Sequence, residues 1–439
     1  MDGTREKVQR FNSKYKGSTV WDCPILGCSI NFDYDMLTFC CSSTQYDVRP
    51  VVQLGDGSGF SKEAYISAYM DVFEKNQEGT GACCGCKYLT KGRFRPVDYD
   101  ELRINHVILN HFRGCNSKCV YCGQTETRTE IGYPVLEILR RLVREKLIIP
   151  GGSIDFGGGE PSMLPDLGKY LDFGYENKMR IFVNTSGLLF RAELLEGLRA
   201  GQIKLQISPD AGTAKTYKKV KQQNGFGQVW KNIKRYCEYG RNVSIKYIVF
   251  SYNSSKAEID NFIELCKSSG VKNVVVSGEA VAALEGQREG VAWTFGEQEC
   301  EACAYLMYRC LESQIACILS TGNFSSFNTE QILNRFFNIY LKKFIIKDGD
   351  KKDRIYIFGL GKNGKLLCDM CINYGVDIEG FCDNDVNKQK ESYRGLKCYP
   401  VDVLDKPRDV VIISIDDYRS AYCQLKELGI GNILNFHFT

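Results

Sequence analysis

The feature that most constrains the fold is a regular alternation of short apolar runs and amphipathic segments between residues 104 and 278. The apolar runs predict strands at 106–112, 153–158, 180–186, 203–210, 243–250 and 273–278, and the amphipathic segments predict helices at 134–146, 165–175, 191–200, 226–238 and 256–269. Strands that alternate with helices form a parallel sheet. Six such units are too few for the usual eight-fold barrel. We therefore expect an α/β fold built on a partial (β/α)6 TIM barrel, with its chemistry at the carboxyl ends of the strands.

Two further regions flank this predicted barrel. The first hundred residues have weak periodicity and hold seven cysteines, which favours a loop-rich, metal-stapled domain over a large apolar core. Residues 297–345 resemble helices, and the polar run at 347–353 is expected to be a linker. A strand–turn–helix pattern then predicts a small, doubly wound, Rossmann-like domain. The predicted domains are 1–102, 103–346 and 354–439.

The cysteine content narrows the chemistry. The chain has 439 residues with 21 cysteines and three histidines, and no apolar run approaches the ~18 residues of a membrane span. The N-terminus is polar and lacks the apolar core of a signal peptide. We therefore expect a cytoplasmic protein with no membrane partner, in which so many thiols indicate metal or cluster chemistry. A net charge of +4 gives no support for nucleic-acid binding.

Three cysteines gather in the loop that follows the first predicted barrel strand. Residues 115–122 read CNSKCVYC, with thiols at Cys115, Cys119 and Cys122. Four thiolates complete an ordinary [4Fe–4S] site, so three thiolates leave one iron open for another ligand. A zinc site or a loop of buried thiols is the alternative. The glycine run GGGEP at 157–161 follows the next predicted strand, and its backbone can approach a ligand closely.

The CxxxCxxC spacing, with an aromatic residue before the last cysteine, and the GGEP motif together resemble the radical S-adenosylmethionine (SAM) superfamily. The resemblance implies that the three cysteines bind a [4Fe–4S] cluster and that SAM chelates its fourth iron. It also implies reductive cleavage of SAM to a 5′-deoxyadenosyl radical that abstracts hydrogen. An external electron donor such as flavodoxin or ferredoxin would supply the electron.

The same resemblance implies a set of SAM-binding residues at the strand ends. The GGEP motif would bind the SAM amino group, and polar residues at the next two strand ends would contact the rest of SAM. These residues are Gly158, Gly159, Glu160, Pro161, Asn184, Ser208 and Asp210. Lys221 stands where many relatives carry an arginine, and lysine keeps the charge but loses the planar bidentate geometry.

The N-terminal cysteines resemble a SPASM-type auxiliary-cluster domain, which in relatives usually follows the barrel. One cysteine precedes a predicted hairpin within 28–41, another ends it, and a CxxC motif follows about forty residues later. The resemblance implies a second [4Fe–4S] cluster on Cys28, Cys41, Cys83 and Cys86. Cys40 could replace Cys41, and Cys23 could replace Cys28. A four-cysteine zinc site and the absence of metal are the alternatives.

Four later cysteines have helical spacings, which favours a packing face over a metal site. They are Cys300, Cys303, Cys310 and Cys317.

The last predicted domain carries a second glycine-rich turn. GLGKNG at 359–364 is a GxGxxG motif after a predicted strand, and Asp383 follows the next strand about twenty residues later. The pattern resembles a Rossmann-like domain of bacterial surface-polysaccharide enzymes. That resemblance implies a nucleotide-sugar or similar polar ligand held by Gly359, Gly361, Gly364 and Asp383. An interaction module without a ligand is the alternative, and the segment is short for an NAD site.

Three functions follow as hypotheses. The first is a radical SAM enzyme that modifies a sugar or glycan precursor, such as a nucleotide-sugar or another small molecule, in polysaccharide or secondary-metabolite biosynthesis. The second is a radical SAM enzyme that modifies a peptide or protein. The third is a non-enzymatic iron–sulfur or zinc scaffold with a nucleotide-binding tail. The sequence has no cobalamin-binding pattern, which disfavours methyl transfer.

Overall fold

The structure is a computed structural model, and it divides into two compact units. It describes residues 2–33, 36–40, 51–52, 60–81, 83–84, 86, 88–122, 132–239, 242–278, 295–345, 354–405, 408–415 and 418–438. The first unit comprises residues 1–118, 122–207 and 239–242, and the second comprises 119–121, 208–238 and 243–439. The predicted linker at 347–353 lies outside the described residues.

The first unit is built on a sheet in the order β4-β3-β2-β6-β7-β8-β9, beside a small antiparallel pair, β1 and β5. Its strands are β1 (Thr19–Asp22), β2 (Ser29–Phe32), β3 (Leu37–Thr38), β4 (Val51–Val52), β5 (Thr90–Arg93), β6 (Ile104–Leu109), β7 (Ile148–Phe156), β8 (Arg180–Thr185) and β9 (Ile203–Ile207). Its helices are α1 (Asp2–Tyr15), α2 (Lys62–Gln77), α3 (Val135–Arg144), the short 3₁₀ turn η2 (Pro161–Met163), α4 (Leu167–Glu176) and α5 (Ala192–Arg199). Strands β2 and β6 to β9 run parallel, as the alternating sequence predicts.

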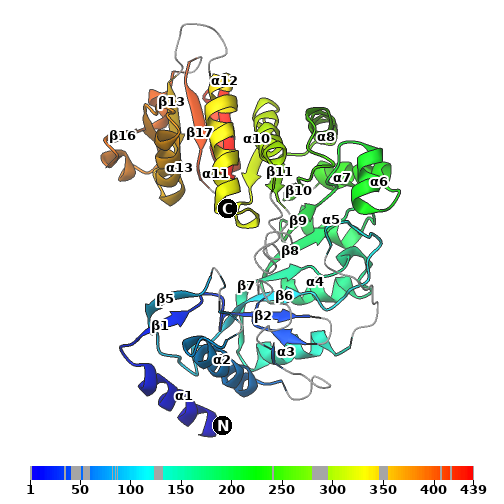
Figure 1. Ribbon diagram of the computed structural model, residues 1–439, viewed down its shortest axis with the longest axis vertical. Coiled ribbons are helices and arrows are strands. Elements are labelled where there is room, and N and C mark those ends of the chain that lie inside the picture. Colours follow the sequence, from blue (N-terminus) through cyan, green and yellow to red (C-terminus); the bar gives the residue numbers. More distant parts are fainter. Residues whose placement is uncertain are drawn as a thin grey trace. The chain divides into compact units, whose positions relative to one another are not determined.

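One face of this sheet is apolar and covered by helices, and the other carries polar side chains. Helices α3, α4 and α5 contact β7, β8 and β9 on one face (Figure 1). Gly174 of α4 comes close to Ile154 and Ile181 on that face, and both isoleucines are fully buried. Because side chains alternate between the faces of a strand, the polar residues at the intervening positions lie on the opposite face. We call that opposite side the polar face; it presents His106, Asn110, Asp155, Asn184 and Gln206.

The second unit contains a longer sheet in the order β15-β16-β14-β13-β17-β18-β12-β11-β10. Its strands are β10 (Val243–Ile248), β11 (Asn273–Ser277), β12 (Ala316–Leu319), β13 (Ile355–Phe358), β14 (Gly380–Cys382), β15 (Ser392–Tyr393), β16 (Leu396–Tyr399), β17 (Val410–Ile413) and β18 (Asn432–Phe438). Its helices are α6 (Ala214–Lys221), α7 (Phe226–Tyr239), α8 (Lys256–Ser268), α10 (Glu297–Glu312), α11 (Ser326–Arg335), the π-helical η4 (Phe336–Leu341), α12 (Lys342–Ile345), α13 (Lys362–Asn373) and α14 (Tyr418–Glu427), with 3₁₀ turns at η3 (Thr321–Asn323), η5 (Lys388–Lys390) and η6 (Val401–Val403).

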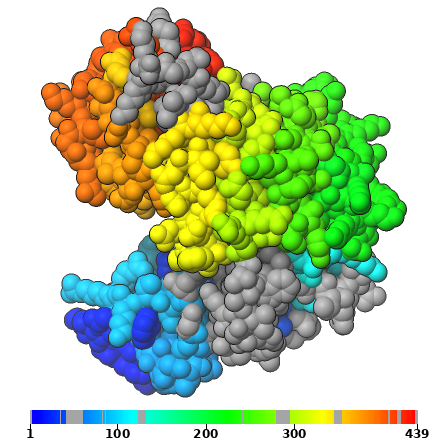
Figure 2. Space-filling model, turned by 45° about the horizontal axis from the view of Figure 1, so that its top comes forward, coloured from blue at the N-terminus to red at the C-terminus, as the bar shows by residue number. Residues whose placement is uncertain are grey.

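The C-terminal strands continue the sheet of the preceding segment. Strand β18 pairs in parallel with β17 on one side and with β12 on the other. Phe337 of η4 also stacks on Tyr374 just after α13, with ring centroids 5.0 Å apart. Figure 2 shows the same adjacency, with the yellow residues near 330 directly against the orange residues near 370. The boundaries predicted for residues 354–439 stay a prediction, but this segment shares hydrogen bonds and packing with its neighbour.

Two local expectations are wrong. Residues 297–345 are not all helical, because Ala316–Leu319 forms β12 between β11 and β18. A run of four apolar residues is too short to show either the helical or the strand periodicity. Its secondary structure therefore depends on the strands that it pairs with.

The N-terminal region is also less loop-rich than expected. Helices α1 and α2 pack through aromatic rings, with the Phe11 centroid 5.1 Å from that of Phe73 and 5.8 Å from that of Phe94. These rings form an apolar core that the weak periodicity of the segment did not indicate. Among the described residues, no helix has the length and apolar character needed to cross a membrane.

Candidate cofactor-binding site

The glycine turn and the cysteine loop of the first unit are hydrogen-bonded to each other through their backbones. The N–H of Gly157 donates to the carbonyl of Leu109 at 3.0 Å. The N–H of Gly159 donates to the carbonyl of Phe112 at 2.8 Å, and the N–H of Glu160 donates to the carbonyl of Gly114 at 2.7 Å. The turn after β7 therefore supports the segment that leads directly into Cys115.

This close approach explains why glycines occupy the turn. Gly158 has a φ of +80°, a left-handed conformation that favours glycine. A Cβ at Gly159 would lie 2.3 Å from the carbonyl oxygen of Gly114, and one at Gly158 would lie 2.8 Å from that of Phe112. The sequence suggested that these glycines make room for a ligand. In the structure they first make room for the cysteine loop.

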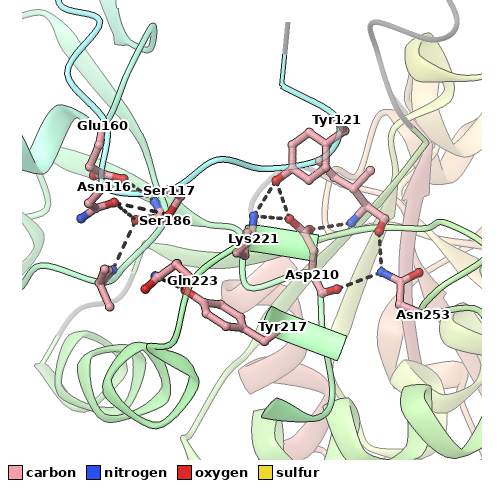
Figure 3. A network of polar contacts seen from close by, with 12 residues as sticks. Asn116, Ser117, Tyr121, Glu160, Ser186, Asp210, Tyr217, Lys221, Gln223 and Asn253 are labelled. Atoms are coloured by element: carbon pink, nitrogen blue, oxygen red, sulfur yellow. Dashed lines mark hydrogen bonds and ion pairs between the residues drawn. The ribbon is translucent and has the colours of Figure 1, made fainter. Parts of the chain in front are cut away.

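The Glu160 carboxylate is buried and holds the end of the next strand. It accepts hydrogen bonds from the backbone N–H and hydroxyl of Ser162 at 3.0 and 2.6 Å. It also accepts from the Thr185 hydroxyl at 2.5 Å and from the Ser186 N–H at 2.7 Å. Pro161 starts the 3₁₀ turn η2 and is buried with it. Glu160 thus joins the end of β7 to the end of β8 (Figure 3).

The cysteine loop contains a buried polar group that protein atoms do not satisfy. The Asn116 side-chain oxygen accepts from the hydroxyls of Ser117 and Ser186, each at 3.4 Å, as Figure 3 shows. Its amide nitrogen is buried and has no hydrogen-bond partner among the described residues. A buried donor of this kind is costly unless something binds to it. This orphaned donor beside Cys115 fits a loop that closes around a polar cofactor.

The thiols of the motif fit the donor set of a cluster, although they are not drawn together. Cys115 and Cys119 are half-buried, Cys122 is exposed, and none of the three forms a disulfide. Across the part of the chain that the structure describes, no three His, Cys, Asp or Glu side chains are close enough to hold a metal ion. The three thiols share one loop, and three thiolates are the donor set of a [4Fe–4S] cluster with one open iron.

In the second unit, Asp210 and Lys221 form a buried ion pair at Tyr121. The Lys221 ammonium lies 2.5 Å from the Asp210 carboxylate and 2.5 Å from the Tyr121 hydroxyl. The Tyr121 hydroxyl donates to the same carboxylate at 2.7 Å (Figure 3). The other Asp210 oxygen accepts from the Ile248 N–H at 2.8 Å. Both oxygens are therefore engaged within the chain, which argues against the SAM contact predicted for Asp210.

The other two predicted strand-end contacts have open surroundings. Ser208 is half-buried immediately after β9. Asn184 is exposed; it accepts from the Gln206 amide at 2.9 Å and donates weakly to the Phe156 carbonyl at 3.4 Å. Their contacts with SAM stay predictions.

The polar face of the first unit carries a second set of groups, which the sequence analysis did not name. The Asn110 amide donates to the Asn31 side-chain oxygen at 3.0 Å. One layer deeper, His106 lies 2.7 Å from the Ser153 hydroxyl and 3.6 Å from the Asp155 carboxylate. One Asp155 oxygen is buried without a partner among the described residues, and burial raises the pKa of this carboxyl despite the nearby His106. These residues could have been found from the sequence, because polar residues alternate with apolar ones along the predicted strands.

The N-terminal cysteines partly follow the predicted arrangement. Strands β2 and β3 form the predicted antiparallel hairpin between Cys28 and Cys40. The Cys28 thiol donates to the Pro24 carbonyl at 3.0 Å, and Cys41 lies outside the described residues. Burial raises the pKa of the Cys83 thiol to about 12, with smaller contributions from Cys40, Cys23 and Cys86 nearby. Cys23 and Cys40, the two alternatives raised by the sequence, are thus neighbours of the CxxC motif.

The four later cysteines are buried in the second unit, on α10 and β12. The predicted packing role is confirmed by their burial, but Cys317 lies on β12 and not on the helix that its spacing predicted.

In the glycine turn of the C-terminal segment, the residues of the turn pack mainly against one another. A Cβ at Gly364 would lie 1.9 Å from the Gly359 carbonyl oxygen, whereas Gly361, at the N-terminus of α13, faces open space. The Asp383 carboxylate accepts from the Leu360 N–H at 2.9 Å and lies 3.2 Å from the Lys388 ammonium. The nucleotide contacts predicted here stay predictions.

The fold and this site define an α/β protein with a parallel sheet and a three-cysteine loop at a strand end. Residues 109–266 match the model of the Radical SAM superfamily, and this range includes both the cysteine loop and the GGEP motif. These residues therefore match a radical SAM domain, the kind of domain that works with a [4Fe–4S] cluster and SAM.

Similar proteins match only part of the chain. It is 29% identical over 106 residues to an AdoMet-dependent heme synthase of Methanosarcina barkeri, covering 24% of this chain and 30% of that protein. It is 24% identical over 177 residues to a GTP 3′,8-cyclase of Clostridium botulinum, covering 39% of this chain and 55% of that protein. The chain thus spans about half or less of the length of these relatives. The structure of Streptococcus suis SuiB bound to S-adenosylmethionine aligns with 61% of each chain, at 15% identity and a TM-score of 0.40.

Proposed function

We propose that this chain is a radical SAM enzyme that abstracts hydrogen from a polar substrate. The observation that carries the proposal is the backbone pairing of the GGEP turn with the segment entering the cysteine loop, through Gly159 and Glu160. This pairing joins the GGEP turn to the residues just before Cys115, which supports a shared cofactor site for the two motifs. Bound SAM and its cluster would supply the 5′-deoxyadenosyl radical that removes the hydrogen atom.

The residues of the chain divide this work among them. Cys115, Cys119 and Cys122 would hold three irons and leave the fourth for SAM. The unsatisfied amide of Asn116 would donate a hydrogen bond to the cofactor. Glu160 would not contact the cofactor directly. Its carboxylate accepts from the Ser186 N–H and so fixes the end of β8 beside the site.

The polar face supports a substrate rich in hydrogen-bonding groups. Asn110, Asn184 and Gln206 follow or lie in three of the parallel strands at the same end of the sheet, and Asp155 lies one layer below. A sugar or glycan precursor, including a nucleotide-sugar, has the hydroxyl groups to match such a surface. The partnerless oxygen of Asp155 would accept a hydrogen bond from one of these hydroxyls.

A peptide substrate is the second candidate. Its support comes from the SPASM-like cysteines and from relatives named as mycofactocin maturases, one of which is 23% identical over 158 residues. Other relatives are named for heme synthesis and for cyclisation of GTP, so their names span several substrate classes. A carbohydrate substrate thus rests on the polar face and on the Rossmann-like resemblance of residues 354–439.

The N-terminal cysteines are proposed to hold an auxiliary [4Fe–4S] cluster. Cys83 and Cys86 would supply two ligands, and the hairpin cysteine would be Cys40 or Cys41. The first ligand would be Cys23 or Cys28; the hydrogen bond of the Cys28 thiol to Pro24 favours Cys23. About eight irons per chain would support two clusters, whereas about four irons with one zinc would identify a zinc site instead.

The deciding experiment is SAM cleavage by the full chain after anaerobic cluster reconstitution. With dithionite, the wild type should form 5′-deoxyadenosine, and Cys119→Ala should abolish this activity. If the wild type forms none while carrying its irons, the enzyme proposal fails and the scaffold hypothesis gains. Adding nucleotide-sugars in one series and peptides in another then separates the two substrate classes, because only a true substrate class should stimulate cleavage.

A further inference from the structure

The middle of the cysteine loop, residues 119–121, belongs to the second unit and is bound within that unit at two points. The backbone N–H of Val120 donates to the Val220 carbonyl at 3.0 Å. The Tyr121 hydroxyl donates to the Asp210 carboxylate at 2.7 Å and accepts from the Lys221 ammonium at 2.5 Å. Figure 3 shows the three side chains pointing toward one another. The segment between Cys119 and Cys122 is therefore anchored by both backbone and side-chain bonds.

This anchor is unusually deep for charged groups. The Lys221 side chain is 2% exposed and the Asp210 side chain is 0% exposed. Two charges removed from water are tolerated only when they pair closely and satisfy their remaining hydrogen bonds. The Asp210 carboxylate meets this condition, because it also accepts from the Ile248 N–H and the Tyr121 hydroxyl, while the Asn253 amide binds the Asp210 backbone carbonyl.

The backbone at Asp210 is held in a strained form. Its φ is +52°, in the left-handed region that residues other than glycine rarely adopt. The Tyr121 ring is fixed as well, stacked on Phe250 with centroids 5.2 Å apart and planes 15° apart. Strain of this kind persists only where the surroundings over-determine the conformation, and it concentrates at functional sites.

We propose that Asp210 and Lys221 are positioning residues for the cluster-binding loop. They fix Tyr121, and with it the cysteines on either side, while their opposite charges cancel beside the cluster. The inference rests on the proposed function, because it assigns these residues a role toward the cluster. It also gives a role to Lys221, which stands where many relatives carry an arginine.

If the pair is neutral beside the cluster, removing either charge should shift the reduction potential of the cluster in a direction set by the charge that remains. A purely structural role predicts no such direction. Lys221→Met would leave the Asp210 anion beside the cluster and lower its reduction potential, because the reduced cluster carries more negative charge. Asp210→Asn would leave the Lys221 cation and raise the potential. The double variant Lys221→Met/Asp210→Asn keeps the approximate shapes and removes both charges, so its potential should return toward that of the wild type.

The test is EPR-monitored redox titration of the full chain with its cluster reconstituted anaerobically. Lys218→Met, an exposed lysine on the same helix, is the matched control. Tyr121→Phe removes only the hydroxyl and is the mildest probe of the anchor. It should release iron to a chelator about tenfold faster, the size expected for losing one hydrogen bond to a charged group.

The outcomes separate the inference from the proposed function. Opposite shifts for the two single variants, with recovery in the double variant, support the positioning role. Equal shifts, or none, with wild-type iron release from Tyr121→Phe, overturn it. If the single variants do not fold, the iron release from Tyr121→Phe still decides. A wild type that takes up no [4Fe–4S] cluster overturns the proposed function and the inference together.

Discussion

The two glycine-rich turns of this protein begin alike and serve different ends. GGGEP follows β7 and GLGKNG follows β13, each at the carboxyl end of a parallel strand. In the first turn, Gly159 presses against Gly114, a residue of another loop. In the second turn, Gly364 presses against Gly359, a residue of the same turn. The close contacts of the first turn are made with a neighbouring loop, whereas those of the second turn are made within the turn.

Each turn has an acidic residue that binds backbone N–H groups. Glu160 binds outside its own turn, whereas Asp383 binds back to the turn itself. Glu160 reaches from its own turn to the end of β8 and is almost fully buried. Asp383 lies after β14, reaches back to the Leu360 N–H and also meets Lys388. Similar local motifs therefore acquire their roles from the partners that the sheet places next to them. Four predicted effects can break or sharpen this contrast.

The largest effect is expected for Glu160→Ala. The change leaves the buried donors of Ser162, Thr185 and Ser186 unsatisfied, which should cost about 4 kcal/mol of unfolding free energy. Chemical denaturation of the metal-free protein measures it. Glu160→Gln keeps the shape and one acceptor, so it should lose clearly less. Equal losses for the two variants would mean that the carboxylate bonds contribute little.

The second effect concerns His111, which lies in the segment that supports the first turn. Burial lowers the pKa of His111 to about 4, and its ring nitrogens have no partners among the described residues. Because the unfolded chain binds this proton first, the stability is present above pH ~6.5 and is lost as the pH falls toward 4. The loss should reach about 3 kcal/mol.

Denaturation of wild type and His111→Phe between pH 7 and pH 4.5 tests this linkage. The phenylalanine ring keeps the packing on Tyr170, whose centroid lies 5.1 Å away, but it does not titrate. The variant should therefore lose less stability than the wild type as the pH falls. Parallel curves for the two proteins would exclude a role for His111.

The third effect compares alanine in the two turns. Gly159→Ala places a Cβ 2.3 Å from a backbone oxygen, and the forced shift should cost about 2 kcal/mol and reduce iron uptake. Gly361→Ala places its Cβ in open space and should cost less than about 1 kcal/mol. Thermal unfolding and iron content measure both variants. A milder effect at Gly159 than at Gly361 would contradict the proposed contact between turn and loop.

The smallest effect is expected for Asp383→Asn. Burial alone would raise the pKa of Asp383, but the N–H groups of Asp385 and Leu360 and the Lys388 ammonium bring it below the usual value. The stability this carboxylate contributes is present above the unfolded pKa of about 3.9 and is lost as the pH falls through the lower folded value. Asp383→Asn should cost about 1 kcal/mol at pH 7 and flatten the acid limb. Hydrogen exchange in α13 would report the loss locally.

The sequence by itself determined the alternating strands and helices, the hairpin of β2 and β3, and the burial of the cysteines on α10. These features follow from local periodicity, turn chemistry and residue type, which act over a few neighbouring residues. The pairing of CxxxCxxC with GGEP was also visible, because both motifs sit at predicted strand ends. Local pattern therefore placed both motifs at neighbouring strand ends, where the structure shows their backbones hydrogen-bonded to each other.

Only the tertiary structure decided what the individual side chains of that site do. The sequence predicted a SAM contact for Asp210 and gave Lys221 no firm role, yet the two meet each other and Tyr121, which lies about a hundred residues away from Lys221. β12, too short for a period of its own, became a strand through its neighbours on both sides. The physical reason is the same in both cases. A buried charge or a short apolar run takes its state from partners distant in the chain, and folding alone brings these partners together.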